Sequence, residues 1–370
     1  MDQFTRLKVK ELFKADKVRH DNTLFKLHHQ VNFFVLLVGV LFIFGENYLN
    51  GKAIVCRGGD SYSNQYCWLH GTGHLHQDLA KDMTHPCVMD QQEVTKDKDR
   101  QTHYYLWLPF VLGICMALVK VPRVVWKNVF ERGFMASMVE RETGEKIAAR
   151  FRKLSKRSNT YFICFIICEI LNICVLVCCF GLLDRLLNGK FWSYGLDVNN
   201  YYSSKPTPEE LVANPALEKP NNPMCSLFPT EVACNLCTGS IGGGCGDKQS
   251  IICILSNNLF NQYFFLILWF WWIFLLSLSI VGILYRAAQL SIPSFSHSVL
   301  LLHLTPVGQE YKASKLSLTP GAMFLLGRLT LNLKGSIMED VLDEIMRSKG
   351  KKGDLEMNEA NDKLMNQDGQ

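Results

Sequence analysis

Four apolar blocks, separated by polar stretches, dominate the hydrophobic pattern of this chain. They cover residues 31–44, 104–125, 161–183 and 263–285. A helix needs roughly 20 apolar residues to cross the hydrocarbon core of a bilayer. Lipid offers no partner to backbone N–H and C=O groups, so each crossing must be helical. The pattern therefore predicts an all-α membrane protein with four transmembrane helices.

The first block is short for a span. It has 14 residues and must be extended toward Leu27 and Leu49 to cross a bilayer. Asn32 and Glu46 also make it more polar than a helix surrounded by lipid. Two interpretations stay open for this block: the end of a helix buried in the protein core, and a helix that faces water on one side.

The second and third blocks carry unusual residues for a span. Pro109 removes a backbone donor and is expected to kink the second helix. Glu169 and Asn172 lie inside the third block. A charged group within a membrane is costly and should face a partner helix or a water-filled space. Glu169 is therefore expected either to make a structural hydrogen bond between helices or to take part in permeation.

The fourth block is rich in tryptophan. Trp269, Trp271 and Trp272 lie well inside it, whereas interfacial aromatic residues usually lie at the ends of a span. We interpret them as packing and lipid contacts rather than as a ligand cage, and expect this helix to form the outer, lipid-facing wall of the protein.

The polar segments differ in their positive charge. Lys and Arg number seven in residues 1–30 and nine in 126–159, but six in the longer segment 45–103 and four in 188–262. Cytoplasmic loops of membrane proteins carry the excess of Lys and Arg. Both termini and the middle loop are therefore expected in the cytoplasm, with the two long loops outside.

These observations divide the chain into ten segments. Helical periodicity in the middle loop and an amphipathic stretch over residues 336–346 predict a helical cytoplasmic dome. The Lys-, Glu- and Asn-rich tail is expected to be disordered. The expected segments are 1–26 (cytoplasmic), 27–49 (first span), 50–103 (first outer loop), 104–125 (second span), 126–159 (cytoplasmic loop), 160–187 (third span), 188–260 (second outer loop), 261–285 (fourth span), 286–348 (cytoplasmic helices) and 349–370 (tail).

The 14 cysteines agree with this orientation. Six lie in the second and third blocks, and eight lie in the outer loops: Cys56, Cys67, Cys87, Cys225, Cys234, Cys237, Cys245 and Cys253. An even number of cysteines outside the cell is typical of a disulfide framework. The spacing from Cys234 to Cys253 matches no strong zinc template. Disulfide-bonded extracellular loops are therefore expected, and no metal site.

Little else in the sequence indicates chemistry. The glycine-rich run 239–246 lacks the phosphate-loop pattern. Histidines cluster in the first outer loop, where they could bind metal or sense protons, but solvated loop histidines are the simpler interpretation; they are His70, His74, His76 and His85. No spacing suggests a catalytic triad or paired carboxylates. We expect no enzyme and no cofactor, and a net charge of +5 does not argue for nucleic acid.

Four sequence elements together resemble the innexins, the invertebrate gap-junction proteins related to pannexins. The second span opens with Tyr104-Tyr105-Leu106-Trp107-Leu108-Pro109, similar to the tyrosine-tyrosine-glutamine-tryptophan-valine signature. The first outer loop contains Tyr66-Cys67-Trp68. The second loop and fourth span, from Phe228 to Trp271, and the tail segment 324–333 follow the family as well.

The resemblance implies a large-pore channel that passes ions and small solutes. By similarity, the chain forms a ring with copies of itself, an octamer, in the plasma membrane. Two rings dock head to head through the outer loops in a gap junction, or a single ring works as a hemichannel. Hetero-oligomers with other innexins and contact with membrane lipid are further implied. The family pairs first-loop with second-loop cysteines, which maps here onto Cys56 with Cys253 and Cys67 with Cys234.

The resemblance also implies which residues face the pore. The amino terminus of the family folds into the pore as a short helix, here residues 1–12, and a ring of Asp2 carboxylates would favour cations. The first span is the other expected pore wall. The residues expected to line the pore are Met1, Asp2, Phe4, Leu7, Asn32 and Glu46.

The chain also departs from the family pattern. Leu106 replaces the signature glutamine, and four cysteines exceed the two that the family keeps per loop: Cys87, Cys225, Cys237 and Cys245. These four could form two further disulfides, whose pairing the sequence does not indicate. The sequence therefore resembles a divergent innexin. The alternative is a four-span membrane organiser or adhesion protein that does not conduct.

Overall fold

The structure is a computed structural model, and it describes residues 21–49, 53–73, 103–139, 143–204, 222–239, 245–305 and 318–347. Several predictions from the sequence lie outside these residues. They concern Met1, Asp2, Phe4, Leu7, Cys87, His74, His76, His85 and the tail 349–370. For Cys237 and Cys245 the structure describes the backbone alone.

Four helical stretches are long and apolar enough to cross a membrane, which confirms the four-span fold. They are Thr23–Leu49, Tyr104–Glu131, Ser158–Leu186 and Asn257–Ser291. The first consists of α2 (Thr23–Lys26), η1 (Leu27–Val31), α3 (Asn32–Phe44) and η2 (Gly45–Leu49). The second consists of α6 (Tyr104–Leu118), α7 (Val121–Val125) and η4 (Trp126–Glu131), and the others are α10 (Ser158–Leu186) and α14 (Asn258–Ser291).

The described chain divides into two compact units. We call the first the sheet unit; it comprises the described parts of 27–120 and 173–277. The second, the tail unit, comprises those of 21–26, 121–172 and 278–347. Helices α10 and α14 each contribute one part to each unit.

The sheet unit contains a three-stranded antiparallel sheet that the sequence analysis did not predict. Its strand order is β1 (Val55–Cys56), β3 (Cys245–Ile254), β2 (Glu231–Gly239). Along β2, Val232, Cys234 and Leu236 are buried, while the residues between them are partly or fully exposed. This alternation with a period of two is the signal of a half-buried strand. The sequence analysis assigned this stretch to the second outer loop and predicted no strand in it.

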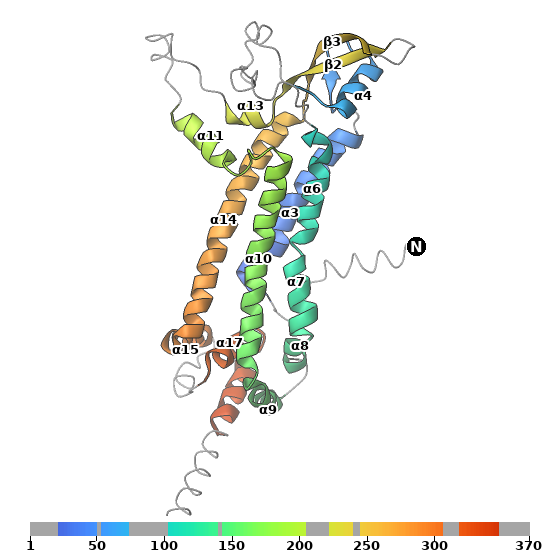
Figure 1. Cartoon of the computed structure of the whole chain (residues 1–370). Helices are drawn as coiled ribbons and strands as arrows, with labels where there is room; N and C mark the ends of the chain where they lie inside the picture. Colours follow the sequence, from blue (N-terminus) through green and yellow to red (C-terminus); the bar gives the residue numbers. More distant parts are fainter. Residues whose placement is uncertain are drawn as a thin grey trace, which may run out of the picture. The chain divides into compact units, whose positions relative to one another are not determined.

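Short helices accompany the sheet. They are α4 (Ser61–His70), α11 (Tyr194–Ser203) and α13 (Pro223–Leu227), and Figure 1 shows α4 beside strands β2 and β3. Below them, aromatic side chains fill the contact between the parts of the spans that belong to this unit. Phe191, Phe228, Phe265 and Trp272 are almost fully buried in one continuous hydrophobic core.

The tail unit is helical, as the sequence predicted. Besides its parts of the four spans, it contains α8 (Phe134–Val139), α9 (Gly144–Ser155), α15 (Pro293–Leu304), α17 (Pro320–Thr330) and a helical segment over residues 335–347. Residues 321–330 are all buried, so α17 is the central helix of this unit. In segment 335–347, Met338, Val341, Leu342 and Ile345 turn inward, which is the expected amphipathic pattern.

The start of α17 lies against the start of α10. Thr319 caps α17, Pro320 occupies its first turn, and the Gly321 N–H donates to Asn159 Oδ1 at 2.9 Å. A Cβ atom on Gly321 would lie 2.5 Å from the carbonyl carbon of Ser158, which is backbone and cannot easily move away. Only glycine therefore fits at this position without a steric clash.

We expect Gly321→Ala to lower the free energy of unfolding by about 1–3 kcal/mol, because the added methyl group overpacks two helices. Thermal unfolding of the purified protein measures this. Gly113→Ala is the matched control, because a Cβ atom at Gly113 meets nothing within 4 Å. Equal unfolding temperatures for the two variants would contradict the packing argument.

Candidate functional site

Two disulfides hold the sheet unit together across long sequence separations. Cys56 of β1 is bonded to Cys253 of β3, and Cys67 of α4 is bonded to Cys234 of β2. All four are buried, and these are the two pairings that the resemblance implies. Each bridge restricts the unfolded chain and typically contributes about 2–4 kcal/mol. The sheet and α4 thus form one cross-linked layer, which we call the disulfide layer.

Local interactions position Cys67 within this layer. Asp60 caps α4 by accepting hydrogen bonds from the Ser63 N–H at 2.8 Å and from the Ser63 hydroxyl at 2.7 Å. These bonds favour the charged carboxylate and lower the pKa of Asp60 below its usual value. The backbone of Cys56 also donates to Asn64 Oδ1 at 2.9 Å, which ties β1 to α4.

Buried polar side chains connect the disulfide layer to the ends of the spans. Asn258, at the start of α14, donates to the Tyr104 hydroxyl at 2.7 Å and to the Pro229 carbonyl at 2.6 Å. Gln262 donates to the Phe228 carbonyl at 2.8 Å, and the Tyr105 hydroxyl donates to the Cys67 carbonyl at 3.4 Å. The signature tyrosines therefore have a structural role: they are buried and fix the layer on α6 and α14.

The other two signature residues behave differently. Trp107 is 61% exposed on the outer face of α6. Pro109 is buried within α6, where it leaves the carbonyl of Tyr105 without its usual helical donor. Asn47 of η2 supplies the missing donor at 3.1 Å, and its own side-chain oxygen accepts from Asn257 at 2.9 Å. The sequence analysis expected a kink at Pro109 and missed Asn47, since the pairing depends on three separate spans.

Asn32 does not line a pore, contrary to the prediction. Its side chain is fully buried inside the sheet unit, where Oδ1 accepts the indole N–H groups of Trp271 at 3.2 Å and Trp272 at 3.0 Å. The tryptophans of the fourth span pack inside the unit, in agreement with the packing contacts expected for them, since Trp269 and Trp272 are also buried. At Asn32, the first block therefore agrees with the interpretation that it is buried in the protein core, and not with the interpretation that it faces water.

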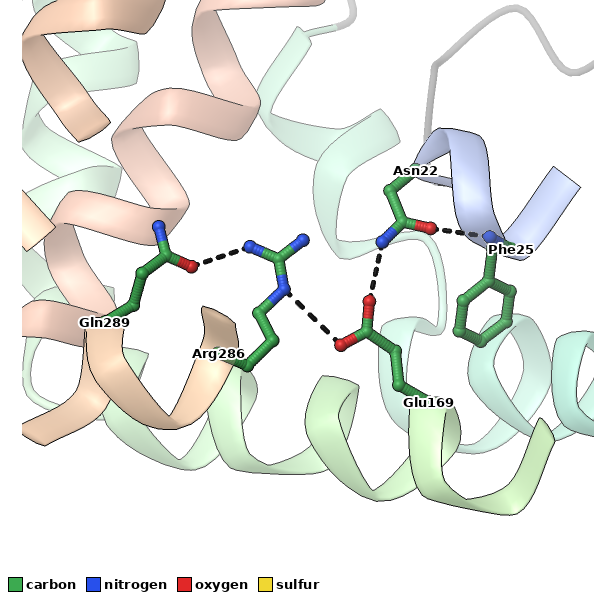
Figure 2. A network of polar contacts seen from close by, with 5 residues as sticks. All are labelled: Asn22, Phe25, Glu169, Arg286 and Gln289. Atoms are coloured by element: carbon green, nitrogen blue, oxygen red, sulfur yellow. Dashed lines mark hydrogen bonds and ion pairs between the residues drawn. The ribbon is translucent and has the colours of Figure 1, made fainter. Parts of the chain in front are cut away.

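Glu169 belongs to a buried polar network in the tail unit (Figure 2). Its side chain is 3% exposed and accepts from Asn22 Nδ2 at 2.6 Å and from Arg286 Nε at 3.4 Å. Arg286 also donates to Gln289 at 2.7 Å, and Asn22 accepts from the Phe25 N–H at 2.7 Å. Glu169 thus makes structural hydrogen bonds between helices, which is the first of the two roles expected for it.

The remaining predicted residues have different outcomes. Glu46 is partly exposed, and its role in the pore stays a prediction. Cys225 of α13 is disulfide-bonded, and the pairing of the additional cysteines also stays a prediction. His70 is exposed and packs against Tyr66, with ring centroids 4.2 Å apart.

No free metal-binding cluster occurs among the described residues. The sulfur atoms of Cys56, Cys67 and Cys253 lie within 4.8 Å of one another. All three are held in disulfides, so none offers a thiolate to a metal ion. The free cysteines of the described chain are those of the spans: Cys115, Cys164, Cys168, Cys174, Cys178 and Cys179.

Comparison with known proteins gives a consistent match. The sequence model of the family described as Innexin matches residues 21–349. Innexin inx2 from Schistocerca americana is 28% identical over 363 residues, which cover 92% of this chain and 96% of that protein. Innexin inx3 from Drosophila melanogaster is 25% identical over 358 residues, covering 91% and 87%. Innexin shaking-B from the same organism is 24% identical over 367 residues, covering 92% and 94%.

We expect Asn47→Ala to lower the free energy of unfolding by about 1–3 kcal/mol, because the buried carbonyl of Tyr105 loses its donor. Adding Pro109→Ala to this variant should recover part of the loss, since alanine, unlike proline, carries a backbone N–H that can reach the same carbonyl. Thermal unfolding of the two single variants and the double variant measures the coupling. Asn199→Ala, at an exposed position, is the control. Strictly additive effects would contradict the idea that the Asn47 side chain replaces the backbone donor that is missing at Pro109.

We expect Glu169→Gln to cost about 3 kcal/mol of stability, because it leaves the charge of Arg286 buried without a carboxylate. Arg347→Gln removes an exposed partner of Glu344 and should cost less than about 1 kcal/mol. Chemical unfolding of both variants decides the matter. A similar small effect for both would show that the buried pair does not support the tail unit.

Proposed function

The chain belongs to the innexin family, and on that premise we propose that it is a subunit of a large-pore channel. The channel works as a gap junction, a hemichannel or both, and passes ions and small solutes between cells or across the plasma membrane. The observation that carries this proposal is the family match over residues 21–349, which includes all four spans and the two disulfides described above.

The packing of the spans supports a pore between subunits. Within the sheet unit, the facing sides of the helices are filled by large aromatic side chains, so this contact is a packed core. Large apolar side chains of α14 also face outward, namely Tyr263, Ile267, Phe270, Phe274 and Val281. They are three, four or seven residues apart, which places them on one side of the helix. Such a stripe suits lipid or a neighbouring subunit. A ring of copies would therefore enclose the pore, and an octamer is the form we favour.

The disulfide layer suits the docking of two rings. Its exposed edge is presented on a cross-linked sheet, and a preorganised surface loses little conformational freedom on binding. Head-to-head contact between two such layers would join two pores. Rings that mix this chain with other innexins follow the same geometry, and lipid covers the remaining apolar faces.

The orientation and the pore lining are part of the proposal. The positive charge of residues 1–30 and 126–159 supports cytoplasmic termini and external disulfides. The candidates for the pore lining are Met1, Asp2, Phe4, Leu7 and Glu46; Asn32 is removed from this set because it is buried. A ring of Asp2 carboxylates would favour cations.

We expect paired cells that express the chain to show electrical coupling, and Cys67→Ser to abolish it by releasing α4 from β2. Cys174→Ser is the matched control, because Cys174 is a free and exposed cysteine of α10. Junctional current and surface labelling are measured together. Normal surface amounts with no current in paired or single cells would contradict the channel and favour the non-conducting membrane organiser.

A further inference from the structure

A cavity of about 330 Å³ lies within the tail unit, beside the network of Glu169. This volume falls in the range of roughly 300–1,000 Å³ that is typical of small-molecule sites. Residues from the first and fourth spans and from α15 and α17 line it. The ones that matter for its chemistry are Asp21, Lys26, Arg286, Ser296, His303 and Arg328.

Positive charge exceeds negative charge on the cavity wall. Lys26, Arg286 and Arg328 contribute three cations, whereas Asp21 is the one carboxylate among the lining residues. That carboxylate already pairs with Arg123, at 3.1 Å. The wall is therefore electropositive even after its own ion pairs are formed.

Arg328 is the feature that indicates a ligand. The residue is 7% exposed, and its Nη2 atom is buried without a hydrogen-bond partner. Its guanidinium lies over the rings of Phe165 and Phe324, 4.8 and 5.3 Å from their centroids. A buried guanidinium nitrogen without an acceptor is costly, and the rings hold the group in place instead of satisfying it.

Arg286 strengthens this requirement. Its guanidinium lies over the same two rings, 5.6 Å from that of Phe165 and 5.4 Å from that of Phe324, so two positive charges share one aromatic site. Glu169 faces Arg286 but already accepts from Asn22 as well (Figure 2). Burial and the charge of Arg286 lower the pKa of Arg328 to about 10, so Arg328 still carries its charge at neutral pH.

We propose that this cavity binds a phosphate group, held by the guanidinium of Arg328 with Lys26 and Arg286 as further cations. Phosphate provides several strong acceptors and matches the planar fork of arginine in two-point contacts. The group can come from an anionic lipid headgroup or from free phosphate. The position of the cavity suits both sources, because its lining lies at the ends of two spans: Asp21 precedes the first span, and Arg286 lies in the last turns of the fourth.

Binding to the purified full-length protein tests this proposal. In one arm, inorganic phosphate is titrated onto protein in phosphatidylcholine nanodiscs, with chloride at matched ionic strength. In the other arm, the nanodiscs contain phosphatidic acid and no free phosphate. The unfolding temperature and native mass spectrometry report binding, and the arm that responds identifies the source of the phosphate group.

Three variants make the result specific. Lys26→Gln removes an exposed cation of the cavity, and Arg328→Lys keeps the charge but loses the fork. We expect both to bind about tenfold more weakly than the wild type. Arg347→Gln, which removes an equal charge outside the cavity, should bind normally. If Arg328→Lys fails to fold, Lys26→Gln decides.

Three results would overturn the proposal. The first is the absence of binding in both arms. The second is a response to chloride equal to that to phosphate, and the third is unchanged affinity in the cavity variants. Because the readout is binding and not current, a failure here is distinguishable from a failure of the channel function.

Discussion

A polar group that enters the apolar interior of a membrane protein must find its partner there, and this constraint arranges both units. In the sheet unit, Asn32 accepts the indole protons of Trp271 and Trp272. In the tail unit, Glu169 accepts from Asn22 and Arg286. These contacts join segments that lie far apart along the chain, so they determine which helices pack together and in which rotation.

The same constraint explains how the disulfide layer is attached to the spans. Pro109 leaves a carbonyl unpaired, and Asn47 fills the gap while holding Asn257. Asn258 also donates to the Tyr104 hydroxyl and thereby joins α14 to α6. Disulfides cross-link the layer, and buried hydrogen bonds attach it to the ends of the spans.

Satisfying polar groups internally also limits where a pore can be. Asn32 and Glu169 both looked like candidates for contact with water, but both are buried, and the Asn32 Oδ1 and the Glu169 carboxylate accept hydrogen bonds within the subunit. Within the sheet unit, the space between the spans is a packed core.

The sequence by itself determined the number of spans, the helical tail unit and, through the resemblance, the cysteine pairs, because these depend on local hydrophobicity and on motifs that can be read in order. Strand β2 was also within reach, since Val232, Cys234 and Leu236 alternate with polar or small residues. Only the tertiary structure decided the roles of Asn32, Asn47 and Glu169. Whether a polar residue in a span faces water or a partner depends on helix rotation, and helix rotation is set by packing against residues that lie far away along the chain.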